Sequence, residues 1–200
     1  EFVPANTSSP AKVDLTVTAT LAGAGSGGAD LVRTATASTV IPPALQTLKY
    51  DADGNLIGDG LWTYSYDAEN RLIAMQTELT AIVAITSANA RRLEFKYDYL
   101  NRRVEKRVLS GWNGSGYTTE LFKRRFLYDG WNLVAEISAS TSALVRSYTW
   151  ALDMAGSLTA TGGIAALVQI TDHGTATSYL PTYDGNGNVA SLVRSSDGVI

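Results

Sequence analysis

A tyrosine followed by an aspartate recurs five times along this chain, and each copy lies between runs of alternating apolar and polar residues. The pairs begin at Tyr50, Tyr66, Tyr97, Tyr128 and Tyr183. The steps from Tyr66 to Tyr97 and from Tyr97 to Tyr128 are equal in length. Chance placement would give fewer than one such pair in a chain of this size. The sequence therefore predicts an array of repeated supersecondary units.

Each copy has the residue types of a strand, a turn and a returning strand. The aromatic residue ends a strand, and rings at such positions pack across to neighbouring strands. The next residue is Asp51, Asp67, Asp98, Asp129 or Asp184, and an Asp side chain here can accept a hydrogen bond from a backbone N–H two residues on. Gly or Asn then tolerates a left-handed backbone, and Leu or Val begins the return strand. Each copy is therefore predicted to be a β-hairpin.

The rest of the chain fits the same class of structure. Residues 1–10 read as a flexible tail, and residues 11–200 as a single domain. Alternation from Val13 to Leu21 and the Thr-rich stretch from Leu31 to Ile41 predict two strands around a glycine-rich loop. That loop lacks the Lys-Ser/Thr and the helix that a phosphate-binding loop requires. The segment from Leu79 to Asn89 fits a strand or a short helix, and its β-branched residues favour the strand.

The repeat resembles the YD-repeat, or RHS-repeat, family, whose units follow the pattern Tyr-Asp-x-x-Gly-Asn-Arg-Leu/Val. The resemblance runs from about Lys49 to Val193, and the copies beginning at Tyr66 and Tyr183 match it best. A degenerate copy containing Trp150 and Asp153 lies between the last two pairs. The resemblance implies an all-β fold: an antiparallel array of β-hairpins that spirals, curls, or forms part of a hollow shell.

In that family, which includes bacterial toxins and teneurins, the shell encloses or presents a C-terminal toxin or effector cargo. The resemblance thus implies a structural segment of a secreted or cell-surface shell, whose partners are the remaining shell and its cargo. The closing region that cuts itself free in many bacterial members is not recognisable here, so no catalytic residue is carried over. The sequence itself begins and ends like an excised fragment. Unpaired edge strands would then favour self-association.

A local excess of positive charge is the main departure from this structural reading. Ten of the 16 Lys and Arg residues lie between Arg91 and Arg125, against four acidic residues, although the net charge of the whole chain is −3. Such a band could attract an anionic partner, including nucleic acid, although alternation predicts a solvated strand face. The candidate residues for an anionic partner are Arg102, Arg103, Arg107, Arg124 and Arg125.

Two further function classes stay open. Trp112 and Trp131 fall at or near loops and could stack on sugars, which would make the chain a carbohydrate-binding or adhesion module. A small glycoside or ester hydrolase would need paired carboxylates, or a serine such as Ser178 or Ser191 beside the single histidine, His173. Neither arrangement has a recognisable motif, so no catalytic residue, metal site or cofactor is predicted. The chain contains no cysteine and no apolar run long enough to span a membrane.

Overall fold

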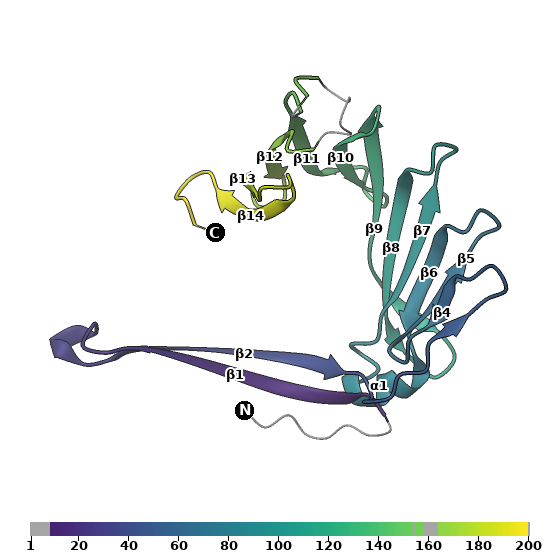
Figure 1. Cartoon of the computed structure of the whole chain (residues 1–200), viewed down its shortest axis with the longest axis horizontal. Coiled ribbons are helices and arrows are strands. Elements are labelled where there is room, and N and C mark those ends of the chain that lie inside the picture. Colours follow the sequence, from purple (N-terminus) through teal and green to yellow (C-terminus); the bar gives the residue numbers. More distant parts are fainter. Residues whose placement is uncertain (1–8, 154, 158–163, 200) are drawn as a thin grey trace. The chain divides into compact units, whose positions relative to one another are not determined.

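The computed structural model describes residues 9–153, 155–157 and 164–199. Two antiparallel sheets account for nearly all of its regular structure (Figure 1). One sheet has two strands, and the other has twelve, ordered from β14 to β3 so that every strand neighbours those next to it in sequence. The predicted all-β array of antiparallel hairpins is therefore confirmed. The larger sheet is open, because its order has two outer strands, β3 and β14.

Strand lengths vary with position along the chain. The first six strands are β1 (Ala11–Leu21), β2 (Leu31–Ile41), β3 (Lys49–Tyr50), β4 (Leu56–Gly58), β5 (Trp62–Tyr66) and β6 (Leu72–Thr77). Four strands follow the helix α1 (Leu79–Ile85), namely β7 (Arg92–Tyr97), β8 (Arg103–Trp112), β9 (Tyr117–Asp129) and β10 (Asn132–Ser138). The last four are β11 (Leu144–Trp150), β12 (Leu167–Asp172), β13 (Thr177–Tyr183) and β14 (Val189–Arg194).

Contacts divide the chain into two compact units. Unit 1 lies within residues 1–92 and 110–119, and unit 2 comprises residues 93–109 and 120–200. The boundary falls inside β8 and β9, so each of these strands contributes residues to both units. The prediction of a single domain over 11–200 stays a prediction. Most of the predicted tail, residues 1–8, lies outside the described residues.

In unit 1, the two strands predicted on either side of the glycine-rich loop form a hairpin that is a two-stranded sheet of its own. β1 and β2 pair in register from Ala11 opposite Ile41 to Leu21 opposite Leu31. The loop between them contains a single 3-10 turn, Ser26–Gly28. Side chains on both faces of this hairpin are largely exposed, and its apolar residues include Val17 and Leu21, which are 66% and 63% exposed.

The strand favoured for residues 79–89 is wrong, because the segment contains the helix α1. The backbone N–H of Thr77 donates to the Arg91 carbonyl (2.9 Å), so the two ends of the connection lie side by side. A through-going strand cannot return to its starting point over so few residues, whereas a helical turn can. The helix buries Ala81 and Ile82, and it ends where Thr86 adopts a φ of 72°.

Five loops share one geometry, which we call the Asp loop. They begin at Asp51, Asp67, Asp98, Asp153 and Asp184. In each, the Asp carboxylate accepts the backbone N–H groups two and four residues on, at 2.8–3.0 Å. The Asp backbone N–H also donates to the carbonyl four residues on, and its carbonyl accepts the N–H three residues on. Every loop is therefore closed by bonds made within it.

A left-handed residue occupies the same place in every Asp loop. The residue three positions after the Asp has a positive φ, and this residue is Gly54, Asn70, Asn101, Gly156 or Gly187. Only Gly, and to a lesser degree Asn, adopts this conformation at low cost. The Gly or Asn of the sequence repeat is thus required by the loop geometry.

Asp129 does not form an Asp loop. Its hairpin turns through only two residues, since Asp129 pairs with Asn132 across Gly130 and Trp131. Gly130, at φ 55°, is the first residue of that turn, a position that favours glycine in two-residue hairpins. The glycine directly after the Asp turns the chain earlier than in the other copies.

A β-bulge follows the turn in the copies whose register is known. Tyr50 pairs with Leu56 and Tyr66 with Leu72, but the preceding residue of each first strand pairs two residues further along the second. The same shift occurs beside Leu133 and Val189. Because a bulge inserts one residue, it reverses the in-and-out alternation of the return strand.

Candidate functional site

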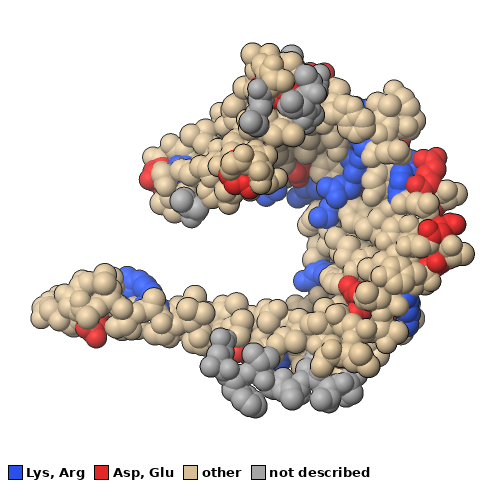
Figure 2. Space-filling model, viewed as in Figure 1, with Lys and Arg blue, Asp and Glu red and all other residues tan. Residues whose placement is uncertain are grey.

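Four cationic side chains of unit 2 line a groove over β8 to β11. We call it the basic groove, and its volume is about 230 Å³. Figure 2 shows Lys and Arg side chains gathered on the surface where Figure 1 places β9. The groove is lined by Arg103, Lys106, Phe122, Arg124, Phe126, Glu136, Val145 and Arg146.

Aromatic rings hold three of these cations. The Arg103 guanidinium lies 5.5 Å from the ring centre of Phe95 and 5.1 Å from that of Phe126. Arg124 and Lys106 both lie over the ring of Phe122, at 5.0 and 6.0 Å. Each contact is a cation–π interaction, worth about 0.5–1 kcal/mol where it is partly exposed. Within the described part of the chain, no carboxylate forms an ion pair with Arg103, Lys106 or Arg124.

Of the five arginines predicted for an anionic partner, Arg103 and Arg124 line the basic groove. The others are held elsewhere. Arg102 forms an ion pair with Asp98 (2.8 Å), and Arg107 forms pairs with Glu94 (3.3 Å) and Glu120 (2.6 Å).

Arg125 alternates away from Arg124 and lies within 3.9 Å of Glu105. The prediction also omitted Lys106 and Arg146 from the candidate set, although both line the groove. Lys106 lies on β8 together with Arg103, and Arg146 reaches the groove because β11 pairs with β10.

A break in alternation on β8 brings Arg103 into the groove. Arg103 lies over Phe95 and Phe126, whereas Glu105, two residues later, pairs with Lys96 (3.1 Å) and Lys123 (3.3 Å). Strict alternation would put Arg103 and Glu105 on the same face. Arg103 directly follows its Asp loop, as Leu56, Leu72 and Val189 follow theirs. The third repeat, which begins at Tyr97, thus has a cationic residue where these other copies have an aliphatic one.

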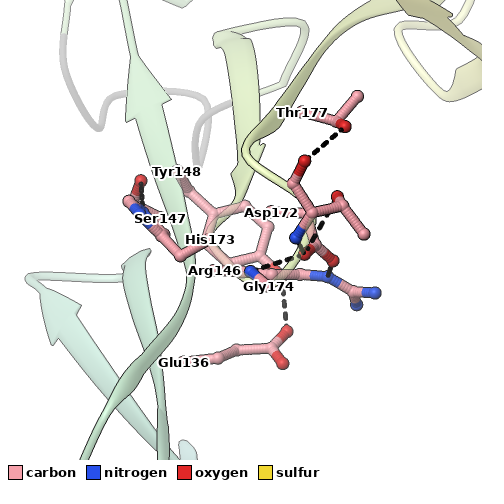
Figure 3. A network of polar contacts seen from close by, with 9 residues as sticks. Glu136, Arg146, Ser147, Tyr148, Asp172, His173, Gly174 and Thr177 are labelled. Atoms are coloured by element: carbon pink, nitrogen blue, oxygen red, sulfur yellow. Dashed lines mark hydrogen bonds and ion pairs between the residues drawn. The ribbon is translucent and has the colours of Figure 1, made fainter.

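A polar network borders the groove (Figure 3). The Tyr148 hydroxyl donates a hydrogen bond to Glu136, and the Arg146 guanidinium lies 3.3 Å from the Asp172 carboxylate. Burial and the Glu136 carboxylate raise the pKa of Tyr148, so its proton stays on the phenol. Backbone N–H groups of Thr175 and Gly174, together with Arg146, lower the pKa of Asp172, although partial burial opposes this shift. Burial opposes the charged form of Arg146, but the Glu136 and Asp172 carboxylates outweigh it and raise the pKa of Arg146, so its guanidinium stays charged.

His173 does not complete a hydrolase triad. Its Nε2 lies 2.9 Å from the Ser147 hydroxyl, a pairing that sequence reasoning missed (Figure 3). Among the described residues, no hydrogen bond joins Asp172 to the His173 ring, and Asp172 instead accepts bonds from its own turn. Ser178 contacts Thr171 and Gln169, and Ser191 contacts Thr182, so neither of the two serines considered from sequence reaches His173.

The carboxylates of unit 1 are used locally. Asp51 and Asp67 each accept bonds within their own Asp loops. Asp59 accepts the backbone N–H groups of Leu61 (2.8 Å) and Trp62 (2.7 Å) and the Tyr64 hydroxyl (2.8 Å). Burial, followed by the bond to Asp59, raises the pKa of Tyr64 to about 12. Within the described ranges, no three His, Asp or Glu side chains are grouped so that they could hold a metal ion.

The two tryptophans predicted for glycan binding differ in exposure. In unit 1, Trp112 packs against Tyr117 with ring centres 5.2 Å apart. In unit 2, Trp131 lies at the tip of the β9–β10 hairpin and is 60% exposed. The residues on either side of it in sequence, Gly130 and Asn132, line a hollow of about 460 Å³ together with Asp129, Val134, Tyr148, Thr149 and Trp150.

The aromatic groups at strand ends have a role that the sequence did not reveal. The Tyr128 hydroxyl donates to the Arg103 carbonyl (3.0 Å). The Trp150 indole donates to the Leu133 carbonyl (2.7 Å), and the Tyr183 hydroxyl donates to the Leu167 carbonyl. In each case the end of one strand is tied to the start of the preceding strand. The polar tip of the aromatic residue, and not only its ring, joins successive strands.

No protein-family model matches the chain, and no curated protein matches it significantly. In the described part of the chain, no helix has the length and apolar character needed to cross a membrane.

Proposed function

We propose that this chain is a structural segment of a repeat-built β wall, of the YD-repeat kind, that encloses or presents a C-terminal toxin or effector cargo. The recurrence of one closed Asp loop along a sheet ordered as the sequence carries this proposal. Such a sheet grows by adding one hairpin after another at its edge. A loop that closes through its own hydrogen bonds gives each addition the same geometry, whatever the strands on either side contain.

Three further observations support a wall rather than an enzyme. The Asp loops use their carboxylates as acceptors for their own backbone, so these groups are engaged in building turns. Bulges follow the turns and increase the local twist, as a curved wall requires. The polar tips of Tyr128, Trp150 and Tyr183 each tie one strand to the strand before it. Localisation outside the cell is part of the proposal and rests on the family resemblance.

The test uses the complete gene product in which this repeat occurs. We expect limited proteolysis to leave the repeat region and a C-terminal partner together, with the partner resistant to cleavage. Replacing Asp67 and Asp98 by Ala should open the loops and make the partner as sensitive as the same segment expressed alone. Equal sensitivity of the partner in the unmodified protein would contradict the proposal.

A wall with open sheet edges is also expected to associate through those edges. The outer strand β14 has an unpaired edge among the described residues, and β14 carries the exposed side chains of Val189 and Leu192. We expect association through this edge, because an unpaired strand can add another strand. Light scattering should show a mass that rises with concentration, and lysine at both positions should suppress the rise. A monomer at all concentrations would contradict edge association.

Carbohydrate binding is a second candidate, favoured by the exposure of Trp131 beside a hollow that contains Asp129 and Asn132. An exposed indole is suited to the face of a sugar, and a hollow with polar lining groups is suited to its hydroxyls. Titration with oligosaccharides should quench the tryptophan fluorescence of the unmodified chain but not of Trp131→Ala, and Trp112→Ala should behave as the unmodified chain. Equal quenching in all three proteins would rule out this site.

A further inference from the structure

We propose that the basic groove binds an acidic peptide segment of a partner protein through the carboxylates of its Asp and Glu side chains. The inference depends on the groove in unit 2 and holds whether or not the chain belongs to a shell. The groove contains four cations, Arg103, Lys106, Arg124 and Arg146, and one carboxylate, Glu136. Because Arg146 is also paired with Asp172 from outside the lining, the groove keeps a surplus of two positive charges. This surplus is the charge complement of a short acidic segment.

The pairing of the strands arranges these groups in a row. Phe126 on β9 lies opposite Glu136 on β10, which in turn lies opposite Arg146 on β11. Arg103 on β8 covers the ring of Phe126. The row therefore begins and ends with an arginine and crosses four strands, a width of about 14 Å. An extended peptide crosses that distance in about four residues.

The cations are positioned before any ligand binds. Arg103 is held between two rings, and Arg124 shares the ring of Phe122 with Lys106. Restricting these long side chains in advance lowers the entropy that binding must remove. Among the described residues, Arg103, Lys106 and Arg124 form no ion pair with a carboxylate, whereas Arg102 and Arg107 do. An incoming carboxylate does not have to displace an existing ion-pair partner from them.

The cations that cover the rings of Phe122 and Phe126 favour a peptide ligand over single-stranded nucleic acid. Nucleic-acid binding of that kind uses free aromatic faces on which bases stack. Here cations lie over Phe122 and Phe126, and Phe126 is only 7% exposed. The edges of a guanidinium still carry N–H donors when its face lies on a ring, and those donors match a carboxylate.

Glu136 also favours a peptide over a continuous chain of phosphates. Its carboxylate lies in the middle of the row and accepts a bond from Tyr148. A polymer that carries a charge at every unit would bring one of them close to this carboxylate. A peptide can place an uncharged residue there, with acidic residues on either side and an apolar side chain against Val145 or Phe126.

Neighbouring arginines on β9 provide a matched pair of variants. Arg124 lines the groove, whereas Arg125 points to the opposite face, where its side chain is 60% exposed. Arg124→Gln and Arg125→Gln remove the same charge from adjacent positions. A third variant, Arg103→Leu, installs the residue type that follows the Asp loop at Leu72 and should fold.

The experiment measures binding of a fluorescein-labelled peptide, about eight residues long, in which two Glu lie four positions apart and Ala fills the other positions, to the full chain by anisotropy. In an extended peptide the two carboxylates lie on one side about 14 Å apart, which is the width of the row, with an uncharged residue between them. We expect Arg124→Gln and Arg103→Leu each to weaken binding about five- to tenfold, and Arg125→Gln to change it less than about twofold. Circular dichroism confirms that each variant is folded.

Two results would overturn the proposal. Equal weakening by Arg124→Gln and Arg125→Gln would mean that only net charge matters. Tighter binding of an oligothymidylate than of the peptide at the same ionic strength, lost in the same groove variants, would assign the groove to nucleic acid. Neither result would bear on the wall proposal, which is tested by protection of a C-terminal partner.

Discussion

The second and third repeats, which begin at Tyr66 and Tyr97, have the same turn but differ in the residue that follows it. In both, an Asp and the Arg four residues later form an ion pair at 2.8 Å, Asp67 with Arg71 and Asp98 with Arg102. In both, an Asn takes the left-handed position. The next residue is Leu72 in one and Arg103 in the other. The shared part builds a hairpin, and the difference supplies a cation to the basic groove.

This contrast separates structural residues from candidate functional ones. A feature found in every copy is explained by the need to form the turn, so the acidic residues of the repeat need no catalytic role. A feature found in one copy needs another explanation. Arg103 is such a feature, since its site receives an aliphatic residue in the second repeat and its charge has no ion-pair partner among the described residues.

The largest expected effect concerns the shared part of the repeat, where it is buried. The Asp153 side chain is only 6% exposed and accepts the N–H groups of Ala155 and Ser157. Asp153→Ala leaves these donors without their partner and should reduce the free energy of unfolding by about 2–3 kcal/mol. Urea unfolding measures this change. Asp184→Ala, in an exposed copy of the loop, is the comparison, and an equal loss there would show that burial does not set the cost.

The left-handed asparagines should show the second largest effect. Asn70→Val and Asn101→Val place a β-branched residue at φ 58° and 62°, which should cost about 1–2 kcal/mol each. Glycine at the same positions should be tolerated without loss. Thermal unfolding of the four variants gives the ranking. A valine variant as stable as its glycine counterpart would disprove the requirement for this backbone conformation.

The sequence predicted the repeated elements better than it predicted their neighbours. The hairpins and the left-handed Gly and Asn positions follow from interactions within about five residues, so local patterns reveal them. The helix α1 was the less favoured of two alternatives, because β-branched residues locally favour a strand, and the bond that joins Thr77 to Arg91 is not visible in the local sequence. The groove was predicted only in part: Arg103 and Arg124 were among the candidates, whereas Arg146 was not, because it comes from a later hairpin.

Low pH should reduce the stabilising effect of the Asp loop in the second and third repeats alike. The backbone N–H and side chain of Arg71 lower the pKa of Asp67, and those of Arg102 lower the pKa of Asp98 against an opposing effect of partial burial. A lowered pKa means that the folded state binds these protons less readily than the unfolded state. Their stabilising effect is therefore complete above about pH 5 and is lost as the pH falls through about 4 and below.

Unfolding midpoints measured between pH 7 and pH 3 test this expectation. The unmodified chain should lose stability below about pH 4, and the double variant Asp67→Asn, Asp98→Asn should lose less over the same interval. Identical slopes for the two proteins would show that the carboxylates of these loops do not contribute to the pH dependence.

The smallest expected effect on stability tests the central claim most directly. If Arg103 serves a ligand and not the fold, Arg103→Leu should leave the free energy of unfolding within about 0.5 kcal/mol of the unmodified chain, because a leucine packing on Phe95 and Phe126 replaces two cation–π contacts. Urea unfolding of this one variant is the measurement. A loss of more than about 1.5 kcal/mol would mean that the third repeat needs its arginine to fold, and it would contradict the separation of shared structure from individual function.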